Sequence, residues 1–140
     1  MAQAFNKFNS FVEALAEKVH NLGSDTLKIL LTNSAPVATN TVKADITEIS
    51  AGNGYTAGGT AATINSSAQS SGTYKLVLGD VVITASGGSI GPFRYAVLYN
   101  DTAANDELIG WWDYGSSISL SSGETLTWDS DQSGGILTLA

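Results

Sequence analysis

The sequence predicts a mainly β protein: an antiparallel sandwich or barrel of about eight short strands, preceded by one α-helix. Apolar and aromatic runs recur about every ten residues, with Gly, Ser, Asn and Asp turns between them. Only one stretch has helical periodicity, and a single leading helix cannot supply the crossovers that a parallel sheet requires. The length of 140 residues fits one domain, 1–140.

The stretch with helical spacing covers residues 4–22. Its apolar side chains recur three or four positions apart, on one helix face: Phe5, Phe8, Val12, Leu15, Val19 and Leu22. Gly23 suits the position just after a helix, where a left-handed residue is favoured. We therefore divide the domain into an N-terminal helical arm, 1–23, and a β-sandwich, 24–140.

Two interpretations of the arm stay open. In the first, the helix packs on its own domain; in the second, it also inserts into a neighbouring subunit. Three phenylalanines, Phe5, Phe8 and Phe11, precede every expected strand and favour the second interpretation. These three side chains are the candidate partner-binding residues.

The expected strands follow the arm in order. Residues 27–32 form the first apolar run, and 42–49 has the composition of either a strand or a short helix. Gly79 interrupts the run 74–84 and predicts a bulge or a break there. The other expected strands are 60–65, 90–99, 108–114, 124–128 and 136–140.

Residues 93–114 hold the two strands around which we expect the core to form. Six aromatic side chains lie in or beside them, and a polar loop joins them as a hairpin: Phe93, Tyr95, Tyr99, Trp111, Trp112 and Tyr114. Neighbouring side chains of a strand face opposite ways, so Trp111 and Trp112 cannot enter the same core. Either both faces of the sheet are covered, or one tryptophan is exposed as a sugar platform or a protein interface.

The charge balance limits the partners. Acidic residues outnumber basic residues 13 to 6, which gives a net charge of −7. An acidic chain has few basic side chains to neutralise the phosphates of nucleic acids or of anionic lipids. We therefore expect no nucleic-acid partner and no membrane partner. No apolar run approaches the roughly 20 residues of a membrane span, and the first residues lack the apolar core of a signal peptide.

Few residues suggest catalysis or cofactor binding. His20 is the only histidine, which excludes a multi-histidine metal site, and we expect it partly exposed at the edge of the helix stripe. The glycine-rich loop 50–60 lacks the lysine and hydroxyl of a phosphate-binding loop. We expect its glycines to supply unusual backbone angles around an inward-facing Tyr55.

The carboxylates of two loops are the remaining candidates. Asp129 and Asp131 form one cluster and residues 101–107 hold another, but neither has the spacing of a calcium loop. No Gly-x-Ser-x-Gly elbow positions a nucleophile, and the absence of cysteine excludes thiolate metal sites. We therefore expect no metal, no cofactor and no enzymatic activity.

Five segments occur in an order typical of a known group. They are 25–32 (DTLKILLT), 52–59 (GNGYTAGG), 94–101 (RYAVLYND), 108–115 with its LIG and WDYG, and Trp128 with 135–139 (GILTL). In this order the chain resembles a widespread group of small virion proteins of tailed bacteriophages, and most resembles the cementing (head-decoration) proteins of short-tailed phages. The resemblance implies a jelly-roll β-sandwich and supplies no catalytic residues.

The resemblance also implies a location and partners. Such proteins sit on the outer surface of an icosahedral capsid, as homo-oligomers that clamp neighbouring major capsid proteins. A protein that spans the boundary between two capsid subunits binds more tightly than one that contacts a single subunit, because the second contact is effectively intramolecular. The first hypothesis is therefore a structural virion protein, a homodimer or other homo-oligomer. The alternative is a tail- or fibre-associated β-sandwich that recognises host glycan through Trp111 or Trp112.

Overall fold

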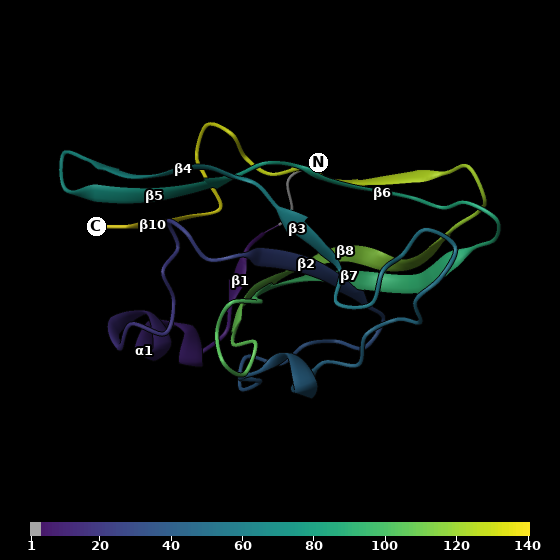
Figure 1. The fold of residues 1–140 in the computed structure, drawn as a ribbon, viewed down its shortest axis with the longest axis horizontal. Helices are drawn as coiled ribbons and strands as arrows, with labels where there is room; N and C mark the ends of the chain where they lie inside the picture. Colours follow the sequence, from purple (N-terminus) through teal and green to yellow (C-terminus); the bar gives the residue numbers. More distant parts are fainter. Residues whose placement is uncertain (1–3) are drawn as a thin grey trace.

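The computed structural model describes residues 4–140, and this part of the chain is mainly β. Its strands form two layers of antiparallel sheet, with one short α-helix beside them (Figure 1). The predicted class, an antiparallel β-sandwich with one N-terminal helix, is confirmed. The described residues hold ten strands, because the expected runs 60–65 and 74–84 are each divided, one extra strand precedes the helix, and 42–49 forms no strand.

One layer is a five-stranded sheet built around the expected aromatic hairpin. Its strands, in spatial order, are β1 (Asn6–Lys7), β8 (Leu108–Leu120), β7 (Ile90–Asn100), β2 (Leu27–Thr32) and β3 (Thr60–Ala62). All neighbouring strands are antiparallel. The long β7–β8 pair lies inside the sheet, where β2 pairs with residues 95–100 of β7 and the short β1 pairs with Gly110 and Trp111 of β8.

The other layer consists of two small sheets, seen above the first layer in Figure 1. One has the order β10 (Leu137–Leu139), β5 (Thr73–Leu78), β4 (Ile64–Ser70), and the other pairs β6 (Val81–Thr84) with β9 (Thr125–Trp128). The break expected at Gly79 is confirmed, because β5 ends before it and β6 begins after Asp80.

The helix is much shorter than predicted. The α-helix α1 covers Ser10–Ala16 only, and the prediction of a helix over 4–22 is wrong in extent. The edge of β8 competes for the first residues: the Phe8 amide donates to the carbonyl of Ile109 (3.2 Å). Gly110 leaves room there, since a Cβ on it would lie 2.1 Å from the ring of Phe5. Sheet pairing therefore overrides the helical pattern.

The segment 42–49, left open between strand and helix, contains a 3-10 turn, η1 (Lys43–Asp45). Beyond it, Glu48 forms an isolated bridge to Thr32 at the end of β2. This segment lies on the side of the five-stranded sheet that faces away from the second layer, as Figure 1 shows for η1.

Apolar side chains fill both faces of the five-stranded sheet. The larger cluster lies between the layers and includes Ile29, Leu98 and Ile109, which are 0% exposed. A smaller cluster covers the opposite face: Phe8, Leu30, Val97, Tyr99 and Leu108, with Ile46 and Trp111 packed against it. Each fully buried aliphatic or aromatic side chain contributes about 1.5–3 kcal/mol. Of the two interpretations of Trp111 and Trp112, coverage of both faces is confirmed.

The glycine-rich loop is fastened to the sheet through tyrosines. Tyr55 is buried, as predicted; its hydroxyl accepts from the Leu31 amide (3.0 Å) and donates to Glu48 Oε1 (2.7 Å). The same carboxylate oxygen accepts from the Gly58 amide (2.7 Å), and the Tyr99 hydroxyl donates to the Gly58 carbonyl (2.6 Å). Burial raises the pKa of Tyr55, so the phenol stays protonated and keeps both hydrogen bonds.

The glycine-rich loop comes very close to β2 at Gly59, and a substitution there tests how much this approach matters. Its φ is +80°, and a Cβ there would lie 2.0 Å from the Ile29 carbonyl oxygen. We expect Gly59→Ala to lower the free energy of unfolding by about 2 kcal/mol or more, because steric overlap adds to the backbone strain. Urea denaturation measures the change.

Gly72→Ala is the matched control for this substitution. Gly72 has a similar φ of +83° and no atom within 4 Å of its Cβ position, so only the backbone cost of about 1 kcal/mol applies. Equal losses in the two variants would show that the loop does not press on the Ile29 carbonyl.

Candidate functional site

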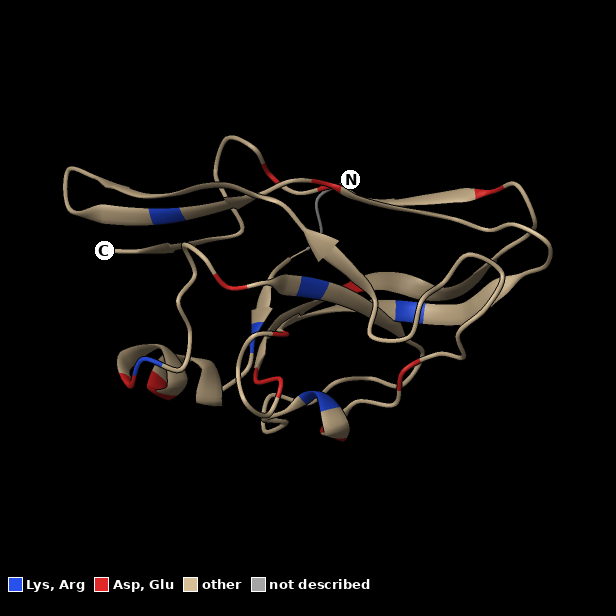
Figure 2. Ribbon diagram, in the orientation of Figure 1, with Lys and Arg blue, Asp and Glu red and all other residues tan. Residues whose placement is uncertain are grey.

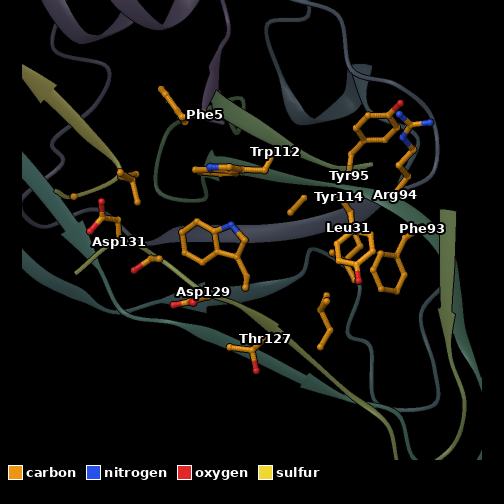
Figure 3. Close-up of a pocket in the computed structure, with 16 residues that line it drawn as sticks. Phe5, Leu31, Phe93, Arg94, Tyr95, Trp112, Tyr114, Thr127, Asp129 and Asp131 are labelled. Atoms are coloured by element: carbon orange, nitrogen blue, oxygen red, sulfur yellow. The ribbon is translucent and has the colours of Figure 1, made fainter. Parts of the chain in front are cut away.

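A groove of about 560 Å³ opens between the two layers, and aromatic side chains form part of its lining (Figure 3). We refer to it as the aromatic groove. Its aromatic lining comes from the arm, from β7 and β8, and from β9: Phe5, Phe93, Tyr95, Trp112, Tyr114 and Trp128. Its volume is in the range of small-molecule sites.

Strand alternation places the tryptophans in the aromatic groove. Trp112 and Tyr114 are two residues apart on β8, so they share one face of the strand. On β9, Leu126 and Trp128 are partly buried, whereas Thr125 and Thr127 are exposed. The two indoles meet across the layers, with ring centroids 4.9 Å apart and planes at 71°.

Trp112 is held on two sides. The ring centroid of Phe5 lies 5.3 Å from that of Trp112, with an interplanar angle of 51°. On its other side, Trp112 makes the edge contact with Trp128, which belongs to the second layer. Trp112 is therefore only 9% exposed, whereas Tyr114 is 50% exposed. Each tilted or edge contact adds about 0.5–1.5 kcal/mol beyond the buried area. The groove thus has a rigid floor and an open aromatic side.

Two carboxylates lie at one end of the aromatic groove, on the turn that follows β9 (Figure 3). Asp131 Oδ1 accepts from the amides of Ser133 (2.9 Å) and Gly134 (2.7 Å). These bonds lower the pKa of Asp131, so its carboxylate is charged at neutral pH. The turn is itself anchored, because the Ser130 amide donates to Asp80 Oδ1 (2.9 Å).

At the opposite end of the groove, Arg94 and Asp113 form an ion pair whose charges offset each other. Arg94 donates from Nε to Asp113 Oδ1 (2.8 Å) and from a terminal nitrogen to Oδ2 (3.0 Å). The guanidinium lies over the Tyr95 ring, 5.4 Å from its centroid. The pairing with Arg94 lowers the pKa of Asp113 and cancels the charge locally. Beside this ion pair, the groove carries the negative charge of Asp129 and Asp131, which the neighbouring Lys75 ammonium partly offsets at Asp131.

The three candidate partner-binding residues fall in different environments. Phe8 and Phe11 are 0% and 2% exposed in the core of their own chain, where Phe8 packs on Trp111 (4.6 Å). Phe5 is partly buried, against Trp112. The structure packs the arm on its own domain, and binding of a partner by these side chains stays a prediction. Of the three, Phe5 alone keeps part of its surface open for it.

A second cluster surrounds His20, which is buried at 5% exposure; the prediction of a partly exposed histidine is wrong. Because α1 ends at Ala16, the chain turns and His20 enters the fold beside Phe11, with rings 5.4 Å apart. Asn100 Nδ2 donates to His20 Nδ1 (3.0 Å) and to Asp25 Oδ2 (2.7 Å).

The surroundings of Asn100 set the tautomer of the imidazole. Its Oδ1 accepts from the amides of Thr102 and Ala103, so its Nδ2 faces His20 as a donor. Nδ1 of His20 is then the acceptor, and the proton resides on Nε2, which has no hydrogen-bond partner among the described residues. Burial lowers the pKa of His20, against the opposing charges of Glu107 and Asp25.

Other candidate sites have simpler roles. In the loop 101–107, Asp101 forms an ion pair with Lys28 (3.0 Å). Within residues 4–140, no three His, Asp or Glu side chains gather closely enough to hold a metal ion. No helix of the described chain is both long and apolar enough to cross a membrane.

The aromatic groove was not predicted as a unit. Residues 124–128, which end in Trp128, were predicted as a strand, and Trp112 was one of two candidate sugar platforms. Their meeting depends on the stacking of two layers whose strands are distant in sequence, for which the sequence has no local signal. Comparison of the chain with protein-family models, curated proteins and solved structures gives no match.

The His20 cluster predicts a pH dependence of stability. The folded pKa lies below the ordinary value of 6.5, so the unfolded chain binds the proton more readily. The stabilisation is fully present above pH 6.5 and is lost as the pH falls from there towards the folded pKa. We expect the urea midpoint to fall over that interval.

His20→Gln removes the titrating group and should flatten this dependence. Asp113 and Asp131, whose pKa values are lowered, lose their contribution to folding stability only at a pH below the range in which His20 titrates. The difference between wild type and variant in that range therefore reports on His20. A wild-type midpoint that is constant from pH 7 to about 5, or a slope retained in the variant, would contradict the assignment.

Proposed function

We propose that this chain is a non-enzymatic structural protein that decorates and cements the outer surface of a phage capsid. In this role it bridges neighbouring major capsid proteins as a homodimer or other homo-oligomer. The ordered resemblance of the five segments supports the proposal, and so does the β-sandwich that the resemblance implies.

The observation that carries the proposal is an exposed apolar surface on the arm. Because Phe8 and Phe11 face inward, α1 turns Val12 outward, where it is 51% exposed. Val37, 53% exposed, precedes Ala38, whose carbonyl accepts from the Asn9 amide (2.9 Å). The loop with Val37 therefore adjoins the start of α1. We define Val12 and Val37 as the arm surface, and we infer that it contacts the shell.

Charge and shape favour a bridging role over a genome-binding one. Asp and Glu are spread over both layers and the connecting loops, with few basic residues among them (Figure 2). This distribution disfavours competition for packaged DNA. The molecule is elongated, with α1 and β10 at one end and β6 at the other (Figure 1), and a homo-oligomer would present one arm surface per copy to neighbouring subunits. Simultaneous contacts raise the overall affinity without new chemistry.

Reconstitution on capsids tests the proposal. Purified protein is mixed with shells that lack it, and occupancy is measured by electron microscopy and shell rupture by heating. We expect the wild-type protein to occupy the outer surface and raise the rupture temperature. Val12→Asp with Val37→Asp should lower the apparent affinity at least about tenfold, because each carboxylate must be desolvated at the contact.

Val82→Asp is the matched control, since Val82 is 55% exposed but lies on β6, away from the arm. Deletion of the arm would be less informative, because it removes Phe8 and Phe11 from the core. Absence of binding by the wild-type protein would refute the capsid role. Equal losses in the arm variant and the β6 variant would refute the arm surface alone.

A further inference from the structure

We propose that the aromatic groove is a carbohydrate-binding site that takes a neutral sugar ring. The ring would stack on the open aromatic side near Tyr114 and Trp128, with its hydroxyls directed to Asp129 and Asp131. The proposal concerns a different surface from the arm surface of Val12 and Val37, and it does not depend on the capsid role.

The aromatic side chains suit the apolar face of a sugar. Aromatic rings carry negative charge on their faces, which attracts the slightly positive C–H groups that line one side of a pyranose. Tyr114 is half exposed and Trp128 is partly buried, so both keep ring surface towards the opening. Phe5 and Trp128 hold Trp112 in place, so binding orders few side chains and loses little entropy.

The carboxylates suit the hydroxyl edge of the same ring. Asp129 is exposed, and Asp131 is fixed by two backbone amides that occupy its Oδ1, which leaves Oδ2 for a ligand. A carboxylate accepts charge-assisted hydrogen bonds from hydroxyl groups, and these bonds are stronger than neutral ones. An aromatic platform beside two carboxylate acceptors thus matches a molecule with an apolar face and a hydroxyl rim (Figure 3).

The same charges select against other occupants. Anionic sugars and phosphates would meet the repulsion of Asp129 and Asp131. Arg94 already pairs with Asp113, and the Lys75 ammonium, which donates to the Ser133 carbonyl, offsets the charge of Asp131 only in part. A wholly apolar protein segment would cover the carboxylates without supplying donors, which is unfavourable. A groove of about 560 Å³ accommodates one or two sugar rings.

Titration with disaccharides tests the proposal. The probes are maltose, cellobiose, lactose and N,N′-diacetylchitobiose, with glucose 6-phosphate as the anionic comparison. Binding is followed by the indole N–H signals of Trp112 and Trp128 in NMR spectra. We expect at least one neutral probe to shift both signals with a dissociation constant of millimolar order or tighter, and the phosphate to bind at least about tenfold more weakly.

The third tryptophan is an internal control. Trp111 lies on the other face of β8 and packs on Phe8, so its signal should not move and Trp111→Phe should leave binding unchanged. Trp128→Ala should weaken binding at least about tenfold, and Asp129→Ala about fivefold. Asp129 is exposed, so its substitution leaves the core intact and keeps the test valid if Trp128→Ala fails to fold.

Three results would overturn the proposal. The first is the absence of any shift with all four neutral probes at about 50 mM. The second is binding that Asp129→Ala leaves unchanged or that glucose 6-phosphate matches. The third is a loss of shell occupancy in Trp128→Ala without sugar binding by the wild-type protein, which would assign the groove to a protein contact.

Discussion

The need to cover both faces of the β7–β8 hairpin governs the architecture of this protein. Trp111 and Trp112 are adjacent on one strand, so they point to opposite sides of the sheet and each requires its own apolar cover. The second layer covers the Trp112 side. The other side is closed by Phe8 from the arm, Ile46 from the 42–49 segment and the side chains of the sheet itself. Segments that would otherwise be surface loops thereby become part of the core.

This constraint explains why the sequence predicts some elements and not others. The hairpin, the inward-facing Tyr55, the break at Gly79 and the alternation before Trp128 depend on local pattern and turn chemistry, and the structure agrees with each. The helix over 4–22 depended on periodicity alone. Pairing of β1 with β8 and burial of Phe8 gain more than the lost helical turns, so tertiary contacts decide the outcome.

The candidate sites were less predictable than the fold for the same reason. His20 is buried because α1 ends early, and no local signal places Asn100 beside it, 80 positions away in sequence. The aromatic groove likewise requires residues from the arm, β8 and β9 to meet across two layers. The residue types were visible in the sequence, but their convergence is a property of the layer packing.

Phe5 belongs to two regions at once, and this sharing has a mechanical consequence. It adjoins β1 of the arm, its ring fills the space left by Gly110, and its face packs against Trp112 in the wall of the groove. Any displacement of the arm by a neighbouring molecule must carry that ring along and reshape the wall. Movement of the arm is therefore coupled to the shape of the groove through Phe5, and a side chain at position 110 would push this ring out of its place.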